Sequence, residues 1–150
     1  MRETGERAIV NWGYNAWGGK YPPFDLDDNI PGKVAADMIV VMVEPDESDP
    51  NHQPLHENRK RLEQVFDVAE LPMPRRIESD GQRLPASYAN FHISNAHVIV
   101  PTYRDANDER ALGILREYFP GRPVIGLDST DLIWGLGSFH CLTQQEPEAK

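Results

Sequence analysis

Apolar residues along the chain fall into short runs separated by polar, proline-containing loops, a pattern typical of alternating strands and helices. Residues 39–43 form a continuous apolar run rich in β-branched side chains and predict a buried strand. Residues 7–12 predict a shorter strand that leads into a glycine-rich aromatic loop. Residues 55–68 have apolar positions spaced for one face of a helix, with Pro54 in its first turn and the Leu-Pro-Met-Pro segment at 71–74 ending it.

A second unit follows, with the order strand, strand, helix, strand. Its first two strands are joined by a Ser-Asn turn and predict a hairpin, and Asp108 is placed to cap the helix. The four segments lie at residues 88–93, 96–100, 108–119 and 123–127. Residues 75–78 predict one more short strand, so the region before the hairpin could be the remainder of a similar unit. The pattern therefore predicts an α/β protein.

Length and charge restrict the classes of partner. A chain of 150 residues suits one domain, which we expect to cover residues 1–150. The net charge of −9 leaves no basic excess to neutralise phosphates, so we expect no nucleic-acid partner, whereas a cationic substrate is compatible. The longest apolar run, residues 38–43, is far shorter than the roughly 20 residues that span a bilayer, so we expect no membrane partner. The charged start of the sequence lacks the apolar core of a signal peptide, and we expect a cytoplasmic protein.

The single cysteine, Cys141, excludes an internal disulfide and a cysteine-rich zinc site. A lone cysteine is most often a small buried apolar residue; the alternative is a nucleophile, which needs a neighbouring cation or dipole. Gly135 and Gly137 just before it permit close backbone approach, which suits a loop around a small ligand. If a strand carries Cys141, the adjacent His140 points to the opposite face and is a poor partner.

The aromatic loop near the start offers a second candidate contact. Trp17 and its aromatic neighbours could form a wall for an aliphatic amine, since aromatic faces attract cations. The alternative is that these side chains only pack the loop onto the rest of the fold. The nearby acids at residues 25–28 fit a solvated loop better than a cation site.

Several blocks of the sequence resemble the agmatine deiminase family, which is related to the Porphyromonas-type peptidylarginine deiminases. WGLGSFHCLTQQ at residues 134–145 resembles the family's C-terminal signature, and WGYNAWGGKYPPFDLDD at residues 12–28 resembles its tryptophan-glycine block. SDPNHQPLHENRKRLE, LPMP, LPASYANFHISNAHVIVP and NDERAL with FPGRPVIGLDS resemble its C-terminal half. The blocks occur in the family's order and cover nearly the whole chain.

The resemblance implies a fold, a reaction and a set of residues. The fold would be a pentein, an α/β propeller of ββαβ-like units around a pseudo-fivefold axis, here as an incomplete ring. The reaction would be hydrolysis of agmatine to N-carbamoylputrescine and ammonia in putrescine biosynthesis, with no metal and no organic cofactor. Cys141 would be the catalytic nucleophile, and the substrate-binding residues would be Trp17, Gly135 and Gly137.

The sequence also departs from the family. Members carry an EGG block and a GHxDD block with the catalytic histidine, and neither is present here, so that a piece at 1–37 joins directly to a piece at 38–150. Glu3 stands where the family's N-terminal block has aspartate, although this segment fits a plain hairpin turn as well. Four histidines match no catalytic position and are expected at the surface or in the hairpin: His52, His56, His92 and His97.

These departures predict little or no deiminase activity in the chain by itself, because a cysteine nucleophile without its acid–base partner loses orders of magnitude in rate. Two alternatives stay open: a non-catalytic remnant or interaction module, and a deiminase for peptidylarginine or another guanidine. A shortened ring would expose apolar edges, so we also expect homo-oligomerisation, marginal stability or aggregation.

Overall fold

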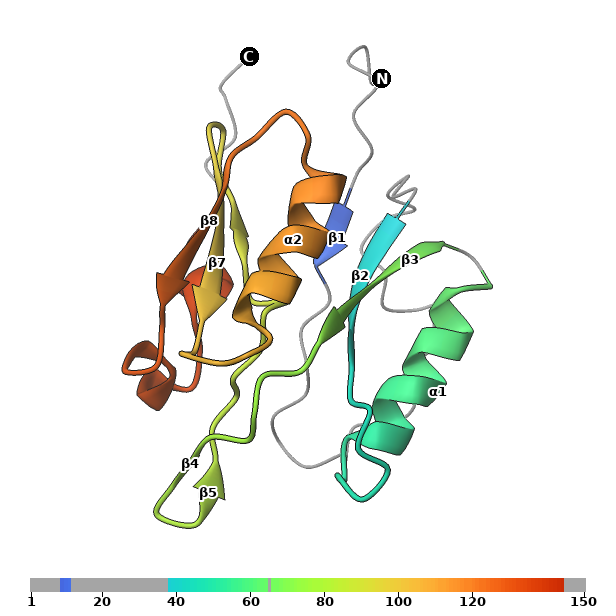
Figure 1. The fold of residues 1–150 in the computed structure, drawn as a ribbon, viewed down its shortest axis with the longest axis vertical. Helices are drawn as coiled ribbons and strands as arrows, with labels where there is room; N and C mark the ends of the chain where they lie inside the picture. Colours follow the sequence, from blue (N-terminus) through green and yellow to red (C-terminus); the bar gives the residue numbers. More distant parts are fainter. Residues whose placement is uncertain (1–8, 12–37, 65, 145–150) are drawn as a thin grey trace.

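Two three-stranded sheets frame the part of the chain that the computed structural model describes, namely residues 9–11, 38–64 and 66–144 (Figure 1). The first sheet has the order β1-β2-β3 and is entirely parallel. Its strands are β1 (Ile9–Asn11), β2 (Met38–Val43) and β3 (Asp67–Pro72). Helix α1 (His52–Leu62) connects β2 to β3, as a crossover between parallel strands requires. Trp17, Glu3 and the acids at 25–28 lie outside the described residues.

The second sheet confirms the strand-strand-helix-strand unit expected from the sequence. It has the order β6-β7-β8, in which β6 and β7 form an antiparallel hairpin and β7 and β8 are parallel. Its elements are β6 (His92–Ile93), β7 (Val98–Thr102), α2 (Asp108–Tyr118) and β8 (Val124–Asp128). A small separate hairpin, β4 (Glu78–Ser79) with β5 (Gln82–Arg83), links the two halves.

The predicted helix at residues 55–68 is wrong in its second half. The helix begins at His52 and ends at Leu62, and residues 67–72 form β3 instead. Phe66 and Val68 pack against Val41 of the neighbouring strand, and β3 pairs with β2 along its whole length. A short apolar run fits a helix face or a strand, and pairing with β2 decided between them.

Two predicted strands are also shorter than expected. Of residues 75–78 only Glu78 is in a strand, and of residues 88–93 only His92 and Ile93 are. Tyr88 and Ala89 instead form a buried turn. The alternation of large and small side chains there reflects packing of a turn, not pleating of a strand.

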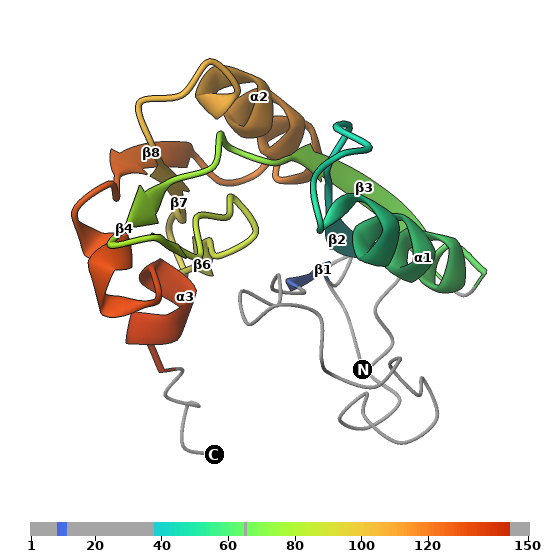
Figure 2. The same cartoon turned by 90° about the horizontal axis from the view of Figure 1, so that it is seen from below.

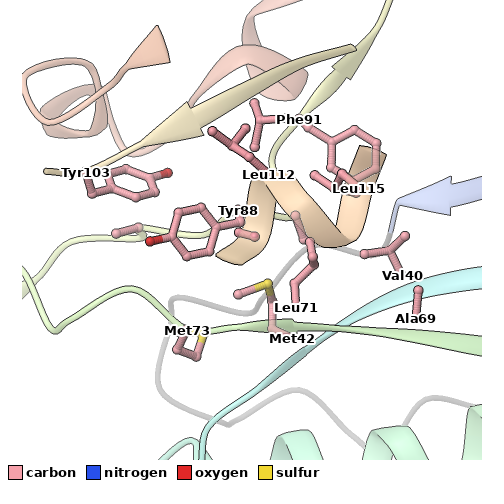
Figure 3. Close-up of a cluster of buried hydrophobic side chains, with 14 of the residues drawn as sticks. Val40, Met42, Ala69, Leu71, Met73, Tyr88, Phe91, Tyr103, Leu112 and Leu115 are labelled. Carbon is pink, nitrogen blue, oxygen red and sulfur yellow. The ribbon is translucent and has the colours of Figure 1, made fainter. Parts of the chain in front are cut away.

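The main core lies between α2 and both sheets, because α2 contacts β8 on one side and β3 on the other. The predicted apolar face of this helix is confirmed: Ala111, Leu112 and Leu115 are buried, and Phe119 packs edge-on against Phe91 with ring centroids 6.0 Å apart. Figure 3 shows how side chains from both sheets meet around this helix. They include Val40, Met42, Ala69 and Leu71 of the first sheet, and they are joined by Tyr88 of the buried turn and by Tyr103, which follows β7.

Helix α2 approaches β8 closely enough to require a glycine there. A Cβ at Gly126 would lie 2.9 Å from Leu112 Cδ1 and 2.9 Å from Thr102 Cγ2. No helix in the described ranges is both long and apolar enough to cross a bilayer.

Candidate active site

Cys141 lies on α3 (Phe139–Leu142), a single helical turn that follows the 3-10 turn η1 (Leu132–Gly135), and its side chain is exposed. Figure 2 shows α3 beside the second sheet and on the far side of the molecule from α1. The expectation that a strand carries Cys141 is therefore wrong. Adjacent positions on a helical turn do not face each other either, so His140 remains badly placed as a partner of the thiol.

Asn90 holds the cysteine segment through both ends of its side-chain amide and through its backbone carbonyl. Its Oδ1 accepts the backbone N–H of His140 at 2.9 Å and that of Cys141 at 3.3 Å, while its backbone carbonyl accepts His140 N–H at 3.2 Å. The end of the amide that faces two backbone N–H donors must be the oxygen. The other end is therefore Nδ2, which points at the sulfur and lies 3.1 Å from Cys141 Sγ. Asn90 can therefore donate to the thiolate that a nucleophile needs.

The turn that carries Asn90 is itself held from β7. Tyr103 Oη accepts Ser87 N–H at 3.1 Å and donates to Ser87 O at 3.2 Å. Asn90 N–H donates to the same carbonyl at 3.2 Å. Asp108 at the start of α2 accepts Tyr88 Oη at 2.7 Å and the backbone N–H of Tyr103 at 3.1 Å. A buried network thus runs from α2 to the cysteine.

The two tyrosines of this network stay protonated at neutral pH. Burial raises the pKa of Tyr103 to about 12. The negative charge of Asp108 raises it further, whereas hydrogen bonds with Ser87 and Ser138 lower it. Burial and the Asp108 carboxylate raise the pKa of Tyr88 as well. Both phenols therefore serve as hydrogen-bond donors in a fixed framework and do not act as bases.

Thr143 fastens the other end of α3. Its Oγ1 donates to Phe139 O at 2.9 Å and lies 2.9 Å from His92 Nδ1 on β6. His92 is in the hairpin, as expected, and it also contacts the cysteine segment. The turn is consequently pinned at its start by Asn90 and at its end by His92.

The two glycines before Cys141 differ in their surroundings. A Cβ at Gly137 would lie 2.8 Å from Cys141 Cβ and 3.2 Å from its Sγ, whereas a Cβ at Gly135 would meet nothing within 4 Å. Leu136 between them has φ of 63°, a left-handed conformation that costs a leucine about 1 kcal/mol or more. Gly137 thus permits the close approach of its loop to the thiol, and substrate binding by either glycine stays a prediction.

Within residues 9–11, 38–64 and 66–144, no histidine or carboxylate hydrogen-bonds to Cys141 Sγ. The same residues hold no group of three or more histidine, cysteine or acidic side chains that could ligate a metal ion. The site is therefore an exposed thiol with an amide donor.

Sequence reasoning missed Asn90, Ser87 and Tyr103, although two of them lie in the LPASYANF block. Asparagine is depleted in strands, so its position between Ala89 and Phe91 was a signal against a regular strand. Its contact with Cys141 spans 51 positions and has no local signature.

The fold and the site define an α/β protein of ββαβ-like units with an exposed cysteine on a short terminal helix. Residues 33–147 match the sequence profile of the Porphyromonas-type peptidyl-arginine deiminases. The chain belongs to this family.

Individual relatives support the assignment. A Streptomyces avermitilis protein with the provisional name of agmatine deiminase is 32% identical over 142 residues, which cover 87% of this chain and 41% of that protein. A Lactococcus lactis protein of the same name is 46% identical over 85 residues, or 57% and 22% of the two chains. The chain thus spans well under half the length of these relatives.

Solved structures give the same fold. The agmatine deiminase of C. jejuni superposes with a TM-score of 0.68 at 35% identity, covering 72% of this chain and 34% of that one. The agmatine deiminase of Enterococcus faecalis gives a TM-score of 0.71 at 27% identity, covering 75% and 37%. The expected fold class, a partial pentein of ββαβ-like units in an open arrangement, is confirmed.

Proposed function

We propose that this chain carries the cysteine-bearing part of a guanidine-hydrolysing active site and that agmatine is the substrate of that site. The products are N-carbamoylputrescine and ammonia, and the proposal includes a role in putrescine biosynthesis in the cytoplasm. The observation that carries the proposal is an exposed cysteine, Cys141, whose sulfur is met by the amide of Asn90 at 3.1 Å. The names of the C. jejuni and E. faecalis relatives supply the substrate.

The proposed chemistry is a double displacement at the guanidinium carbon. The Cys141 thiolate attacks this carbon and forms a C–S bond; a terminal C–N bond then breaks, and the nitrogen takes a proton and leaves as ammonia. Water attacks the same carbon of the amidino-cysteine, the C–S bond breaks to release the thiolate, and both protons of the water pass to a base or to solvent as the neutral carbamoyl product forms. Asn90 donates to the sulfur in its charged states and orients the turn that carries it.

Each of these steps also needs a proton donor or acceptor and acids that hold the guanidinium group. The described residues offer none in contact with Cys141 Sγ: His92 is bonded to Thr143, and His140 contributes only its backbone to the Asn90 contacts. We infer that the chain by itself has little or no deiminase activity.

Ammonia release from agmatine tests this inference, with Cys141→Ala as the blank. We expect the two proteins to give equal rates. A rate that depends on agmatine and is abolished by C141A would contradict the inactivity, and comparison with an arginine-containing peptide would then separate agmatine from the peptidylarginine alternative.

Recognition of the guanidinium group can be tested even without turnover. Chloroacetamidine and chloroacetamide carry the same alkylating carbon, but only the amidine is cationic and planar like a guanidine. We divide the rate of each reagent with Cys141 by its rate with a free thiol, and we expect this ratio to be larger for the amidine than for the amide. Equal relative rates would mean that this chain does not recognise the guanidinium group.

One observation favours the interaction module as a second candidate. Trp134, Leu136 and Leu142 around the cysteine are 60%, 47% and 66% exposed, and Ile125 and Leu127 on β8 are 38% and 44% exposed. Large apolar side chains at the surface are typical of a face that another chain covers. Sedimentation at increasing concentration distinguishes a self-associating module from a monomer.

A further inference from the structure

We propose that His52 and His56 form a two-imidazole binding site on α1 for a divalent transition-metal ion of the Zn²⁺, Ni²⁺ or Cu²⁺ class. The two residues are four positions apart on the same helix, so their side chains lie above one another on one face. Their rings are stacked, with centroids 6.0 Å apart and planes inclined by 13°. Two histidines at this spacing on a helix are an established zinc-binding arrangement.

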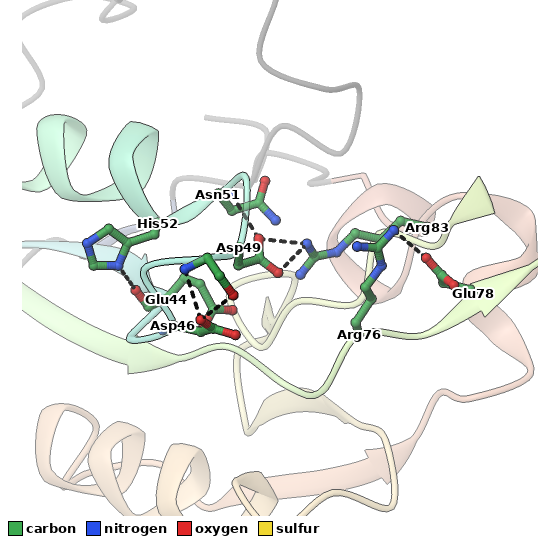
Figure 4. A network of polar contacts seen from close by, with 9 residues as sticks. Glu44, Asp46, Asp49, Asn51, His52, Arg76, Glu78 and Arg83 are labelled. Carbon is green, nitrogen blue, oxygen red and sulfur yellow. Dashed lines mark hydrogen bonds and ion pairs between the residues drawn. The ribbon is translucent and has the colours of Figure 1, made fainter. Parts of the chain in front are cut away.

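The contacts of His52 prepare one of its ring nitrogens for a metal. Its Nδ1 lies 2.7 Å from the backbone carbonyl of Glu44 (Figure 4). A carbonyl only accepts, so Nδ1 is the donor of this contact, and in the neutral ring the lone pair is on Nε2. Metal-binding histidines in proteins characteristically donate their second ring nitrogen to a carbonyl or carboxylate in this way, because the bond fixes both tautomer and ring orientation.

Charge around the pair also favours a cation. Asp46 accepts the backbone N–H and the hydroxyl of Ser48 at 2.9 and 2.7 Å, and it belongs to the loop whose Glu44 carbonyl contacts His52. Glu44 belongs to the same loop, and its carboxylate accepts Asp46 N–H at 3.0 Å. These acids offset the positive end of the α1 dipole, which by itself disfavours a cation at the first turn.

Helix α1 is buried on a different face from the histidine pair, so the pair is accessible from solvent. Leu55 is buried against the core, and Arg59, one turn further on, is paired with Glu70 at 2.5 Å. His56 is exposed, so its ring is accessible to an ion from solvent. Imidazole is a suitable ligand for these ions. Water molecules would occupy the coordination positions that the protein does not fill.

A rival site would involve the thiol. Cys141 is exposed, and His92 and His140 are the histidines nearest to it in the fold. All five histidines of the sequence are in the described residues, so each can be assigned by substitution. The test must therefore remove the helix pair and the thiol separately.

The experiment uses the untagged chain, a Ni²⁺-charged chelating column and Zn²⁺ titration calorimetry. His56→Ala removes one ligand and leaves the His52–Glu44 contact in place. His97→Ala, in the exposed β6–β7 turn, is the matched control, and Cys141→Ser removes the rival ligand. We expect H56A to lose retention and to bind Zn²⁺ at least about tenfold more weakly, with H97A and C141S equal to the parent.

Two results would overturn the proposal: no retention of the parent chain, or loss of binding in C141S with H56A unaffected. Magnetic resonance of the parent gives a second reading that does not depend on a variant. Substoichiometric Cu²⁺ should broaden the imidazole signals of His52 and His56 before those of His92 and His140. Broadening in the reverse order would place the ion at the cysteine site and refute the helix pair.

Discussion

Asn90 and Cys141 are 51 positions apart, yet the amide of the first contacts both the backbone N–H and the sulfur of the second. The carboxamide accepts from the main chain with its oxygen and points its nitrogen at Sγ over 3.1 Å. One side chain therefore sets the position of the candidate nucleophile and supplies a donor for its negative charge. The contact depends on the turn at Ser87, which Tyr103 holds.

Replacing Asn90 by Ala should slow alkylation of Cys141. Loss of the carboxamide removes a hydrogen-bond donor from the sulfur, so the rate of alkylation by iodoacetamide should fall several-fold. Mass spectrometry reports this site alone, because the chain has one cysteine. Asn95→Ala in the exposed hairpin turn is the control. An unchanged alkylation rate in N90A would show that Asn90 has no influence on the thiol.

The two glycines before the cysteine should respond differently to a methyl group. Gly137→Ala places Cβ 2.8 Å from Cys141 Cβ, so α3 must shift or the loop must open, whereas Gly135→Ala meets no atom within 4 Å. We expect G137A to lower the unfolding free energy by about 1–3 kcal/mol and G135A to change it by less than about 0.5 kcal/mol. Urea unfolding measures both; equal effects would refute the close approach.

Asp108 should be more important for stability than its neighbour on the same helical turn. It accepts Tyr88 Oη at 2.7 Å, Tyr103 N–H at 3.1 Å and Asp105 N–H at 3.0 Å. Asp108→Ala leaves buried donors without an acceptor and should cost about 2–4 kcal/mol in unfolding free energy. Glu109 is exposed, and its Oε2 lies 3.6 Å from Arg116 Nη1. Glu109→Ala should therefore lower the unfolding free energy by under about 0.5 kcal/mol. Similar losses in both variants would contradict the buried network.

The lowered pKa of Asp128 predicts that the stability of the fold depends on pH in the acid range. Hydrogen bonds from Thr130, with a further one from Arg104, lower its pKa to about 2 in the folded chain. A carboxyl whose folded pKa is depressed stabilises fully above its unfolded value of about 3.9 and loses that contribution as the pH falls toward 2. The difference in unfolding free energy between the parent and Asp128→Asn should therefore be constant above about pH 5 and shrink toward pH 2.

Salt provides the control for this prediction. The Arg104–Asp128 pair, with 2.6 Å between Nε and Oδ2, has side chains that are 65% and 43% exposed, so screening weakens it. The hydrogen bonds from Thr130 to Asp128 join residues two positions apart in the sequence, and salt weakens them less. A difference that vanished entirely in high salt would assign the effect to Arg104 alone and contradict the leading role of Thr130.

The sequence by itself determined the family and the elements whose pattern is local. The apolar face of α2, the strands at β7 and β8, and the blocks around Cys141 all follow from short-range spacing. These features are readable because a helix face or a buried strand must repeat its apolar positions within a few residues.

Only the tertiary structure decided the rest. Residues 67–72 form a strand because β2 offers an edge to pair with. Residues 139–142 form a helical turn whose N–H groups at His140 and Cys141 are accepted by Asn90. Neither partner is near in sequence, so no local pattern contains it. The position of the candidate nucleophile is therefore a property of the packed fold, since its contacts form only when distant segments are brought together.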